Sequence, residues 1–120
     1  MFATARDAKT IDDLEALGIE TLSLVVDDDT SVKTCYAEVE KRVGQRGLDY
    51  LVNNAGRNHT VPAMDVDVSE ARATFETNLF AVINMCQTFL PLLIKSKGTI
   101  VQIGSVAGVS FVVASYAYRC

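Results

Sequence analysis

Two hydroxyl side chains near the end of the chain have the types and the spacing of a proton-donor site. Ser105 follows an apolar run and Tyr118 lies thirteen positions later, within GSVAGVSFVVASYAYRC. A serine hydroxyl can donate a hydrogen bond to a carbonyl oxygen, and a phenol can act as a general acid toward the same oxygen. An unperturbed phenol has a pKa of about 10, so this tyrosine would need nearby positive charge to donate its proton near neutral pH.

The strands that must position these hydroxyls are predicted by four apolar or β-branched runs. They lie at residues 1–5, 21–26, 48–56 and 98–105, and amphipathic segments separate them. Strands that alternate with helices predict parallel pairing and an α/β layered fold, here one domain over residues 1–120. Ligands of such sheets bind beyond the carboxyl ends of the strands, where Asn53, Asn54 and Ser105 are expected.

Helices are expected between these strands. The segment 10–18 predicts a short helix that ends at Gly18, and 116–120 predicts the start of another. A second helix follows a cap at Asp29 or Thr30. Its buried face is expected to contain Val32, Cys35, Tyr36, Val39 and Val43.

The longest helix is predicted over residues 70–95, with Ser69 as its cap. Pro91 is expected to kink this helix or to begin its final turn. Its apolar part, residues 79–94, is too short for a bilayer and is interrupted by Asn84 and Gln87. We therefore expect a buried helix and no transmembrane span.

Composition and charge exclude several classes of protein. A net charge of −4 offers no basis for binding nucleic acid. Three cysteines at wide spacing match neither a zinc pattern nor a secreted disulfide framework, which predicts reduced intracellular thiols and places Cys86 in the core. His59 is expected at the surface without metal partners, and the acidic run 27–29 is expected to cap a helix, so no metal site is predicted.

Four motifs appear in a recognisable order. NNAG spans residues 53–56, TNLFAVINM contains Asn78, IGSVAG contains Ser105, and Tyr118 follows. Together they resemble the classical short-chain dehydrogenase/reductase family, over essentially all of the chain. FATAR and the segment 80–108 are most similar to fungal-type reductases of 1-acyldihydroxyacetone phosphate. Retinol and hydroxysteroid dehydrogenases of the family have similar sequences in these segments.

The resemblance implies catalytic roles for Asn78, Ser105 and Tyr118. Tyr118 would be the acid, Ser105 would hold the carbonyl oxygen, and Asn78 would anchor a water that connects a lysine to solvent. In the family that lysine follows the tyrosine by four residues and lowers its pKa. If Tyr116 were the acid, Cys120 would occupy the lysine position and the site would be inactive. The separation from Ser105 favours Tyr118, whose lysine position is 122, beyond this sequence.

The resemblance also implies a nicotinamide cofactor. Arg6 follows the first strand with no acidic residue before it, and an arginine there accommodates the 2′-phosphate of NADP(H). Val25 stands where the family often has an aspartate that faces the adenine, whereas Asp28 matches a second acidic position. The predicted cofactor contacts are Arg6, Asp28, Asn53, Ala55 and Gly56.

The predicted fold is an incomplete Rossmann-like, doubly wound parallel sheet that lacks the first strand and the C-terminal strands. The family begins with a strand and a glycine-rich turn that cradles the pyrophosphate, and residues 1–5 correspond to the second strand. In the order 3-2-1-4, strand one lies between strands two and four. The strands at 1–5 and 48–56 should therefore lie about 10 Å apart, unpaired with each other. This piece is not expected to be a stable, active enzyme by itself.

The leading functional hypothesis is an NADPH-dependent reductase of a small, lipophilic carbonyl compound, such as 1-acyldihydroxyacetone phosphate or another lipid ketone. The alternatives are a non-catalytic relative without the glycine-rich loop and the lysine, and an unrelated α/β nucleotide-binding module. The 70–95 region could pack against a second subunit or simply cover the sheet. An intracellular location is expected, either cytoplasmic or peripheral on the endoplasmic reticulum or lipid droplets.

Overall fold

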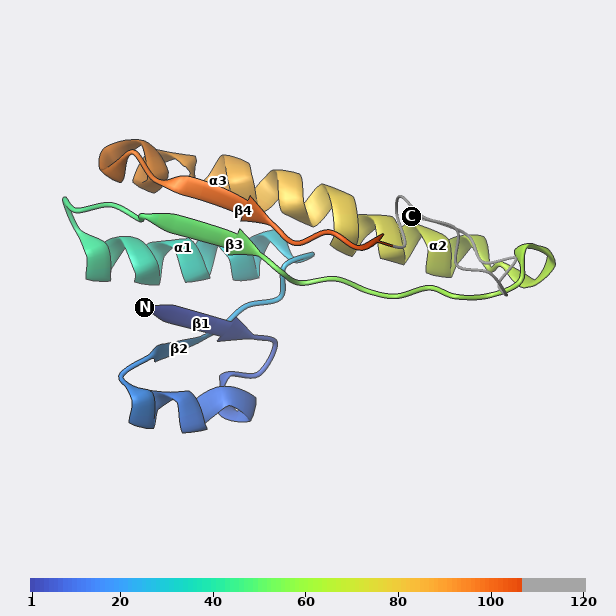
Figure 1. The fold of residues 1–120 in the computed structure, drawn as a ribbon, viewed down its shortest axis with the longest axis horizontal. Coiled ribbons are helices and arrows are strands. Elements are labelled where there is room, and N and C mark those ends of the chain that lie inside the picture. The colour runs from blue at the N-terminus through green and yellow to red at the C-terminus, as the bar shows by residue number, and fades with distance from the viewer. Residues whose placement is uncertain (107–120) are drawn as a thin grey trace.

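A computed structural model describes residues 1–106, apart from the side chain of Ala63. The described strands form two separate parallel pairs, shown in Figure 1. Strand β1 (Phe2–Ala5) pairs with β2 (Glu20–Ser23), and β3 (Tyr50–Asn53) pairs with β4 (Thr99–Gln102). All four predicted strands are present, each shorter than its apolar run, and the helix expected at 116–120 lies outside the described residues.

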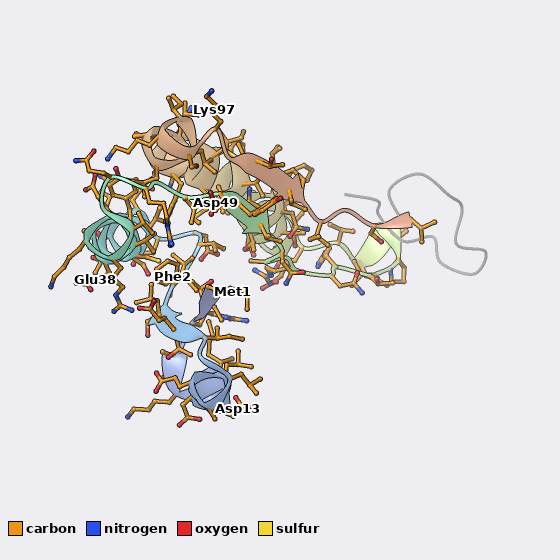
Figure 2. The ribbon with its side chains drawn as sticks, turned by 60° about the vertical axis from the view of Figure 1, so that its left-hand side comes forward. Met1, Phe2, Asp13, Glu38, Asp49 and Lys97 are labelled. Atoms are coloured by element: carbon orange, nitrogen blue, oxygen red, sulfur yellow. The ribbon has the colours of Figure 1, made fainter. Side chains whose placement is uncertain are left out.

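The predicted gap between β1 and β3 is confirmed. Neither strand pairs with the other, although their arrows in Figure 1 point the same way. Figure 2 shows the consequence: β1, β2 and the helix between them project as a lobe, with Asp13 at its tip. The sheet of this α/β fold is therefore divided where a central strand would lie.

The first helix is η1 (Ala8–Leu17), which is a 3-10 helix with non-helical backbone angles at Ile11. Asp7 caps its start, and Gly18 ends it with a φ of 75°, a left-handed conformation that glycine adopts at little cost. The prediction that this helix ends at Gly18 is confirmed, but the helix begins before residue 10.

Helix α1 (Asp29–Val43) is capped by Asp28 and not by Asp29 or Thr30 as predicted. The Asp28 carboxylate accepts a hydrogen bond of 3.0 Å from the Thr30 amide, which gives Asp28 the extended cap conformation and leaves Asp29 as the first helical residue. The predicted buried face is confirmed, with Tyr36 only partly buried.

The longest helical region has three parts: α2 (Val68–Phe75), the π-helical segment η3 (Glu76–Phe80) and α3 (Ala81–Ser96). Its cap is Asp67, not the predicted Ser69, because the Asp67 carboxylate accepts from the Ser69 amide at 2.7 Å. Helix α3 continues through Pro91, and the irregularity lies at η3 instead. A short 3-10 turn, η2 (Ala63–Asp65), lies between β3 and α2.

The core lies where α1 and α3 pack against each other and against one face of β3. Leu51 of β3 is buried on that face, whereas Tyr50 and Val52 are exposed on the other. The helical stretch Val68–Ser96 is long and apolar enough to cross a membrane, but the same test is passed by core helices of soluble proteins. Here one side of α3 is buried in the core, through Met85, Phe89, Leu92 and Leu93.

Candidate active site

The carboxyl ends of the strands bring several predicted site residues to one edge of the molecule. Asn53 ends β3 and leads directly into Asn54, Ala55 and Gly56, and Ser105 lies three positions beyond the end of β4. Arg6 directly follows β1, whose arrow points toward the same side in Figure 1. Asn53, the 54–56 turn and Ser105 therefore share the carboxyl edge of the β3–β4 pair, and Arg6 lies at that of β1.

Asn78 is attached to this edge by its side-chain amide. Its Oδ1 accepts from the backbone N–H of Arg57 at 2.8 Å, and its Nδ2 donates to the Arg57 carbonyl at 2.9 Å. A Cβ atom built on Gly56 would lie 3.4 Å from Asn78 Oδ1. This is an ordinary van der Waals distance, so the π-helical segment packs directly against the turn that follows β3.

Two further contacts fix this approach. Arg57 forms an ion pair of 2.8 Å with Glu70 on α2. The Thr77 hydroxyl is buried and donates to Asp27 Oδ2 at 3.0 Å, across from the start of α1. Arg57 and Thr77 were not predicted from the sequence. Only the nearby NNAG and Asn78 motifs pointed to this region of the sequence. A hydrogen bond to a backbone amide does not require a particular residue type at the position of that amide, so it cannot be recognised from the sequence.

Cys86 connects the two strands of the β3–β4 pair through its sulfur. Asn53 Nδ2 donates to Cys86 Sγ at 3.4 Å, and Gln102 Nε2 donates to the same atom at 3.5 Å. The expectation that Cys86 lies in the core is wrong: the residue is half-buried, at the carboxyl ends of both strands. The Asn53 and Gln102 side chains are thereby linked through one atom of α3.

Of the two charged residues predicted to contact the cofactor, Asp28 already forms a hydrogen bond within the fold and Arg6 is exposed. The Asp28 carboxylate caps α1, so a cofactor contact from Asp28 would share an oxygen with that cap. Arg6 is exposed, and no ion pair involving it is seen among residues 1–106. At Val25, where the family often has an aspartate, the backbone N–H donates a hydrogen bond to Ser31 Oγ at 2.9 Å.

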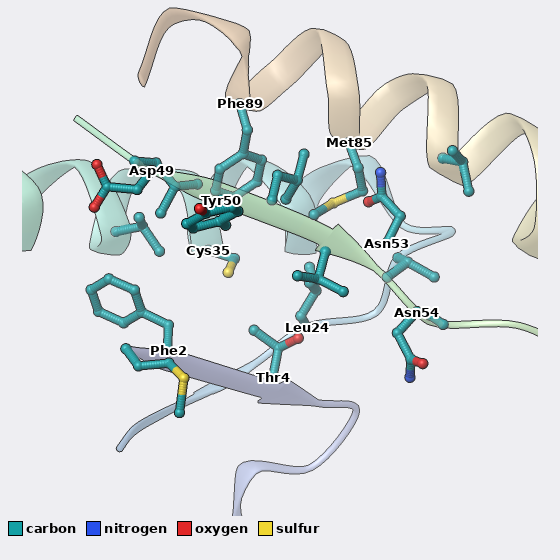
Figure 3. Close-up of a pocket in the computed structure, with 18 of the residues that line it drawn as sticks. Phe2, Thr4, Leu24, Cys35, Asp49, Tyr50, Asn53, Asn54, Met85 and Phe89 are labelled. Carbon is teal, nitrogen blue, oxygen red and sulfur yellow. The ribbon is translucent and has the colours of Figure 1, made fainter. Parts of the chain in front are cut away.

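A cavity of about 740 Å³ lies between β1 and β3, and Figure 3 shows its lining. Asn53 and Asn54 line it at the carboxyl end of β3. Ala55, and Thr77 of the π-helical segment, also belong to its lining. Small and amide-bearing residues beside an open space suit the close approach of a ribose or an adenine. Within residues 1–106, however, no glycine-rich turn joins a strand to a helix, so this part of the chain supplies no pyrophosphate cradle.

His59 lies in the loop before η2 and is not the surface residue that we expected. It is half-buried, and its Nε2 atom is buried without a hydrogen-bond partner among the described residues. The nearby Asp67 carboxyl has a lowered pKa, mainly because the Ser69 hydroxyl and amide donate to it, with a smaller contribution from His59. In the described part of the chain no group of three or more His, Cys, Asp or Glu side chains could hold a metal ion.

The proposed acid lies outside the described residues. Tyr116, Tyr118 and Cys120 all belong to the segment 107–120, so the distance from Ser105 to either phenol stays untested. The structure places Asn53 at the end of β3 and Ser105 three positions beyond the end of β4, and it bonds Asn78 of the π-helical segment to the loop after β3.

The chain is similar in sequence to proteins of one family. A sequence model of the family described as short chain dehydrogenase matches residues 3–120. The short-chain dehydrogenase cctT of Talaromyces islandicus is 41% identical over 109 residues, covering 90% of this chain and 38% of that protein. The NADPH-dependent 1-acyldihydroxyacetone phosphate reductase of Schizosaccharomyces pombe is 39% identical over 105 residues, covering 88% and 35%.

Solved structures show the same fold. The NADPH-bound carbonyl reductase from chicken fatty liver superposes with a TM-score of 0.83 at 30% identity, covering 89% of this chain and 47% of that one. The carbonyl reductase Sniffer of D. melanogaster gives 0.85 at 25% identity, covering 98% and 56%.

The chain belongs to the short-chain dehydrogenase family. It is therefore a member of a family of oxidoreductases with a Rossmann-like fold, and that part of the expectation is confirmed. The chain spans less than half the length of the curated relatives described above.

Proposed function

We propose that the protein containing this chain is an NADP(H)-dependent reductase of a lipophilic carbonyl compound. The proposal rests on three features at the carboxyl edge of the β3–β4 pair: Asn53 ends β3, Ser105 lies three positions beyond β4, and Asn78 bonds to the loop after β3. This is the edge at which parallel α/β sheets bind their ligands. The reaction class follows from membership of the family, and the proposed site residues follow from their positions in this chain.

Three residues of this chain would have separate roles in the reaction. Ser105 would donate a hydrogen bond to the substrate oxygen, and Tyr118 would donate the proton to that oxygen as it becomes an alkoxide. Asn78 would hold the turn after β3 against the π-helical segment, since both ends of its amide are already engaged with the Arg57 backbone. When bound, the reduced nicotinamide supplies the hydride.

The preference for NADP(H) rests on Arg6. Its exposed guanidinium follows β1 at the carboxyl edge, where an arginine can pair with a 2′-phosphate. Asn53, Ala55 and Gly56 would contact the cofactor through a turn with little side-chain bulk, and Asp28 is the remaining acidic candidate. The NADPH-dependent relative and the NADPH-bound carbonyl reductase described above support the same choice.

A lipid ketone is the proposed substrate class, with 1-acyldihydroxyacetone phosphate as its first representative. The support is the yeast relative of that name, which is 39% identical over the matched region. We propose a cytoplasmic or peripheral membrane location to match such a substrate.

The test is NADPH oxidation by a full-length protein that contains this chain, with 1-acyldihydroxyacetone phosphate, retinal and a ketosteroid as substrates. Tyr118→Phe should lower kcat by 100-fold or more, as expected for loss of a general acid, whereas the matched Tyr116→Phe should retain most turnover. Arg6→Ala should raise the KM for NADPH more than that for NADH. Full turnover by Tyr118→Phe would remove the assigned acid, and turnover lost only in Tyr116→Phe would reassign it.

A further inference from the structure

A side-chain hydrogen bond joins the loop after β2 to the helical region that contains Asn78. The buried Thr77 hydroxyl in η3 donates to Asp27 Oδ2 at 3.0 Å, across 50 positions of the sequence. The same hydroxyl lies 3.3 Å from the Ala73 carbonyl, an acceptor that threonine in a helix commonly reaches. The bond to Asp27 is therefore not needed to satisfy a buried hydroxyl, and its effect is to fix where this part of the helical region lies.

The loop after β2 holds Asp27 in a defined place relative to Arg6. Leu24 is buried, and its N–H donates at 2.8 Å to the carbonyl of the residue before Arg6, at the end of β1. The N–H of Asp28 then donates to the Val25 carbonyl at 3.1 Å, which closes a turn around residue 27. The Asp27 carboxylate is thus connected to the carboxyl edge of the β1–β2 pair by a short segment with few free backbone groups.

On the other side of the bond, Thr77 is adjacent to Asn78 in the same helical segment. The Asn78 amide bonds to both the N–H and the carbonyl of Arg57, just after the turn formed by residues 53–56. Strands β1 and β3 do not pair with each other. Within residues 1–106, the contacts from Asp27 to Arg57 therefore connect the carboxyl edges of the two strand pairs through side chains and not through a ladder.

We propose that Asp27 is a positioning residue, which acts through Thr77 to set the distance between Arg6 and the turn formed by residues 53–56. Arg6 and this turn both belong to the proposed cofactor site, so the inference rests on the proposed function. One nucleotide must reach both, and looseness between them lowers the affinity for a cofactor whose 2′-phosphate pairs with Arg6. NADH lacks that phosphate, so Asp27 should matter more for NADPH than for NADH.

Asp29 offers a matched control from the same acidic run. Its carboxylate accepts from Asn84 Nδ2 at 2.9 Å, so this bond also joins the start of α1 to the long helical region. Asn84 lies in α3, beyond η3 and Asn78. Loss of the bond in Asp29→Ala should therefore lower stability without releasing the Arg57 backbone.

The first test measures amide hydrogen exchange at Arg57 in a full-length protein that contains this chain. Asp27→Ala and Thr77→Val remove the same bond from opposite sides, and each should speed exchange at this amide by about threefold or more. Asp27→Asn and Thr77→Ser keep an acceptor and a donor, so both should stay within about twofold of the parent protein. Asp29→Ala should also stay within about twofold.

The second test measures cofactor binding by fluorescence titration without substrate. Asp27→Ala should raise the Kd for NADPH by about fivefold and the Kd for NADH by less than about twofold. In an Arg6→Ala background, the same change should weaken NADPH binding by less than about twofold, because the distance to Arg6 no longer matters.

Unchanged exchange at Arg57 in both Asp27→Ala and Thr77→Val would overturn the inference. Equally fast exchange in Asp29→Ala would also overturn it, since the effect would then be a general loss of stability. A loss of NADPH affinity that is the same with and without Arg6 would do so as well. A parent protein that binds no nicotinamide nucleotide would instead overturn the proposed function, and exchange at Arg57 would still decide whether Asp27 positions the turn.

Discussion

Asn78 holds the backbone of Arg57 from both sides, with Oδ1 accepting from the Arg57 N–H at 2.8 Å and Nδ2 donating to its carbonyl at 2.9 Å. The two residues are 21 positions apart and belong to a π-helical segment and to the loop after β3. One side chain thus satisfies a donor and an acceptor that the loop has no ladder to satisfy. Asn78 is in this respect a structural clamp for the turn formed by residues 53–56.

Removal of the Asn78 amide should increase local opening at Arg57 more than it lowers the stability of the whole fold. We expect Asn78→Ala to lower the free energy of unfolding by about 1 kcal/mol, since the side chain is exposed and its two bonds compete with water. The Arg57 amide should exchange at least several-fold faster. Asn84→Ala is the matched control, because it removes an exposed bond from the same helical region, to Asp29. Unchanged exchange at Arg57 in the Asn78 variant would contradict the clamp.

Substitution of Gly98 by a larger residue should destabilise the fold, because there is no space for a side chain at this position. A Cβ atom at this position would collide with the Leu48 carbonyl and lie 2.9 Å from the Asp49 carbonyl, both of them backbone atoms at the entry to β3. We therefore expect Gly98→Ala to lower the free energy of unfolding by about 1–3 kcal/mol in urea denaturation. Gly104→Ala is the control, since no heavy atom beyond its chain neighbours in residues 1–106 lies within 4 Å of its added Cβ, and it should change stability by less than about 0.5 kcal/mol.

The sequence predicted the elements of this fold better than their ends. The buried face of α1 was predicted correctly, because the 3.6-residue period of apolar side chains survives in Val32, Cys35, Val39 and Val43. Both caps were placed one or two residues late, at Asp29 or Thr30 instead of Asp28 and at Ser69 instead of Asp67. Runs of adjacent capping residues such as DDDT and DVDVS contain several side chains able to cap, and only the backbone conformation selects one.

The candidate site was predicted to a similar degree. Asn53 and Ser105 were predicted at strand ends from the positions of the apolar runs alone; Asn53 is the last residue of β3, whereas Ser105 lies three positions beyond the end of β4. The clamp on Arg57 and the sulfur between Asn53 and Gln102 were not predicted, since they depend on how α3 packs across β3 and β4. The role of Tyr118 stays a prediction.

Replacing Cys86 by an apolar residue of similar size should lower the stability of the fold. Its sulfur accepts from the Asn53 and Gln102 amides, so Cys86→Val would leave two side-chain donors without that acceptor. We expect a loss of about 1 kcal/mol of unfolding free energy in urea denaturation, despite the similar size of valine. Cys35→Val is the matched control at a buried thiol in the core, where a change of similar volume should be tolerated. An equal effect at both positions would mean that the sulfur bonds add nothing.

Stability should fall at alkaline pH because of Cys35. Burial raises the pKa of this thiol, and the positive charge of Arg42 offsets the rise only in part. The side chain is 3% exposed, so the folded chain keeps the neutral thiol at a pH where the unfolded chain already ionises. The stabilisation is then complete below the ordinary thiol pKa and is lost as the pH rises through the higher pKa of the folded state.

The size of this effect can be bounded and isolated. One thiol lowers the free energy of unfolding by at most about 1.4 kcal/mol per pH unit while only the unfolded state ionises. Urea denaturation at several pH values above 8 should show this slope in the parent chain and a shallower one in Cys35→Ala. Tyr36→Phe serves as a second control, since burial also raises the pKa of that phenol and its removal separates the two titrations. If Cys35→Ala and the parent chain lost stability in parallel, the alkaline sensitivity would have to come from another group.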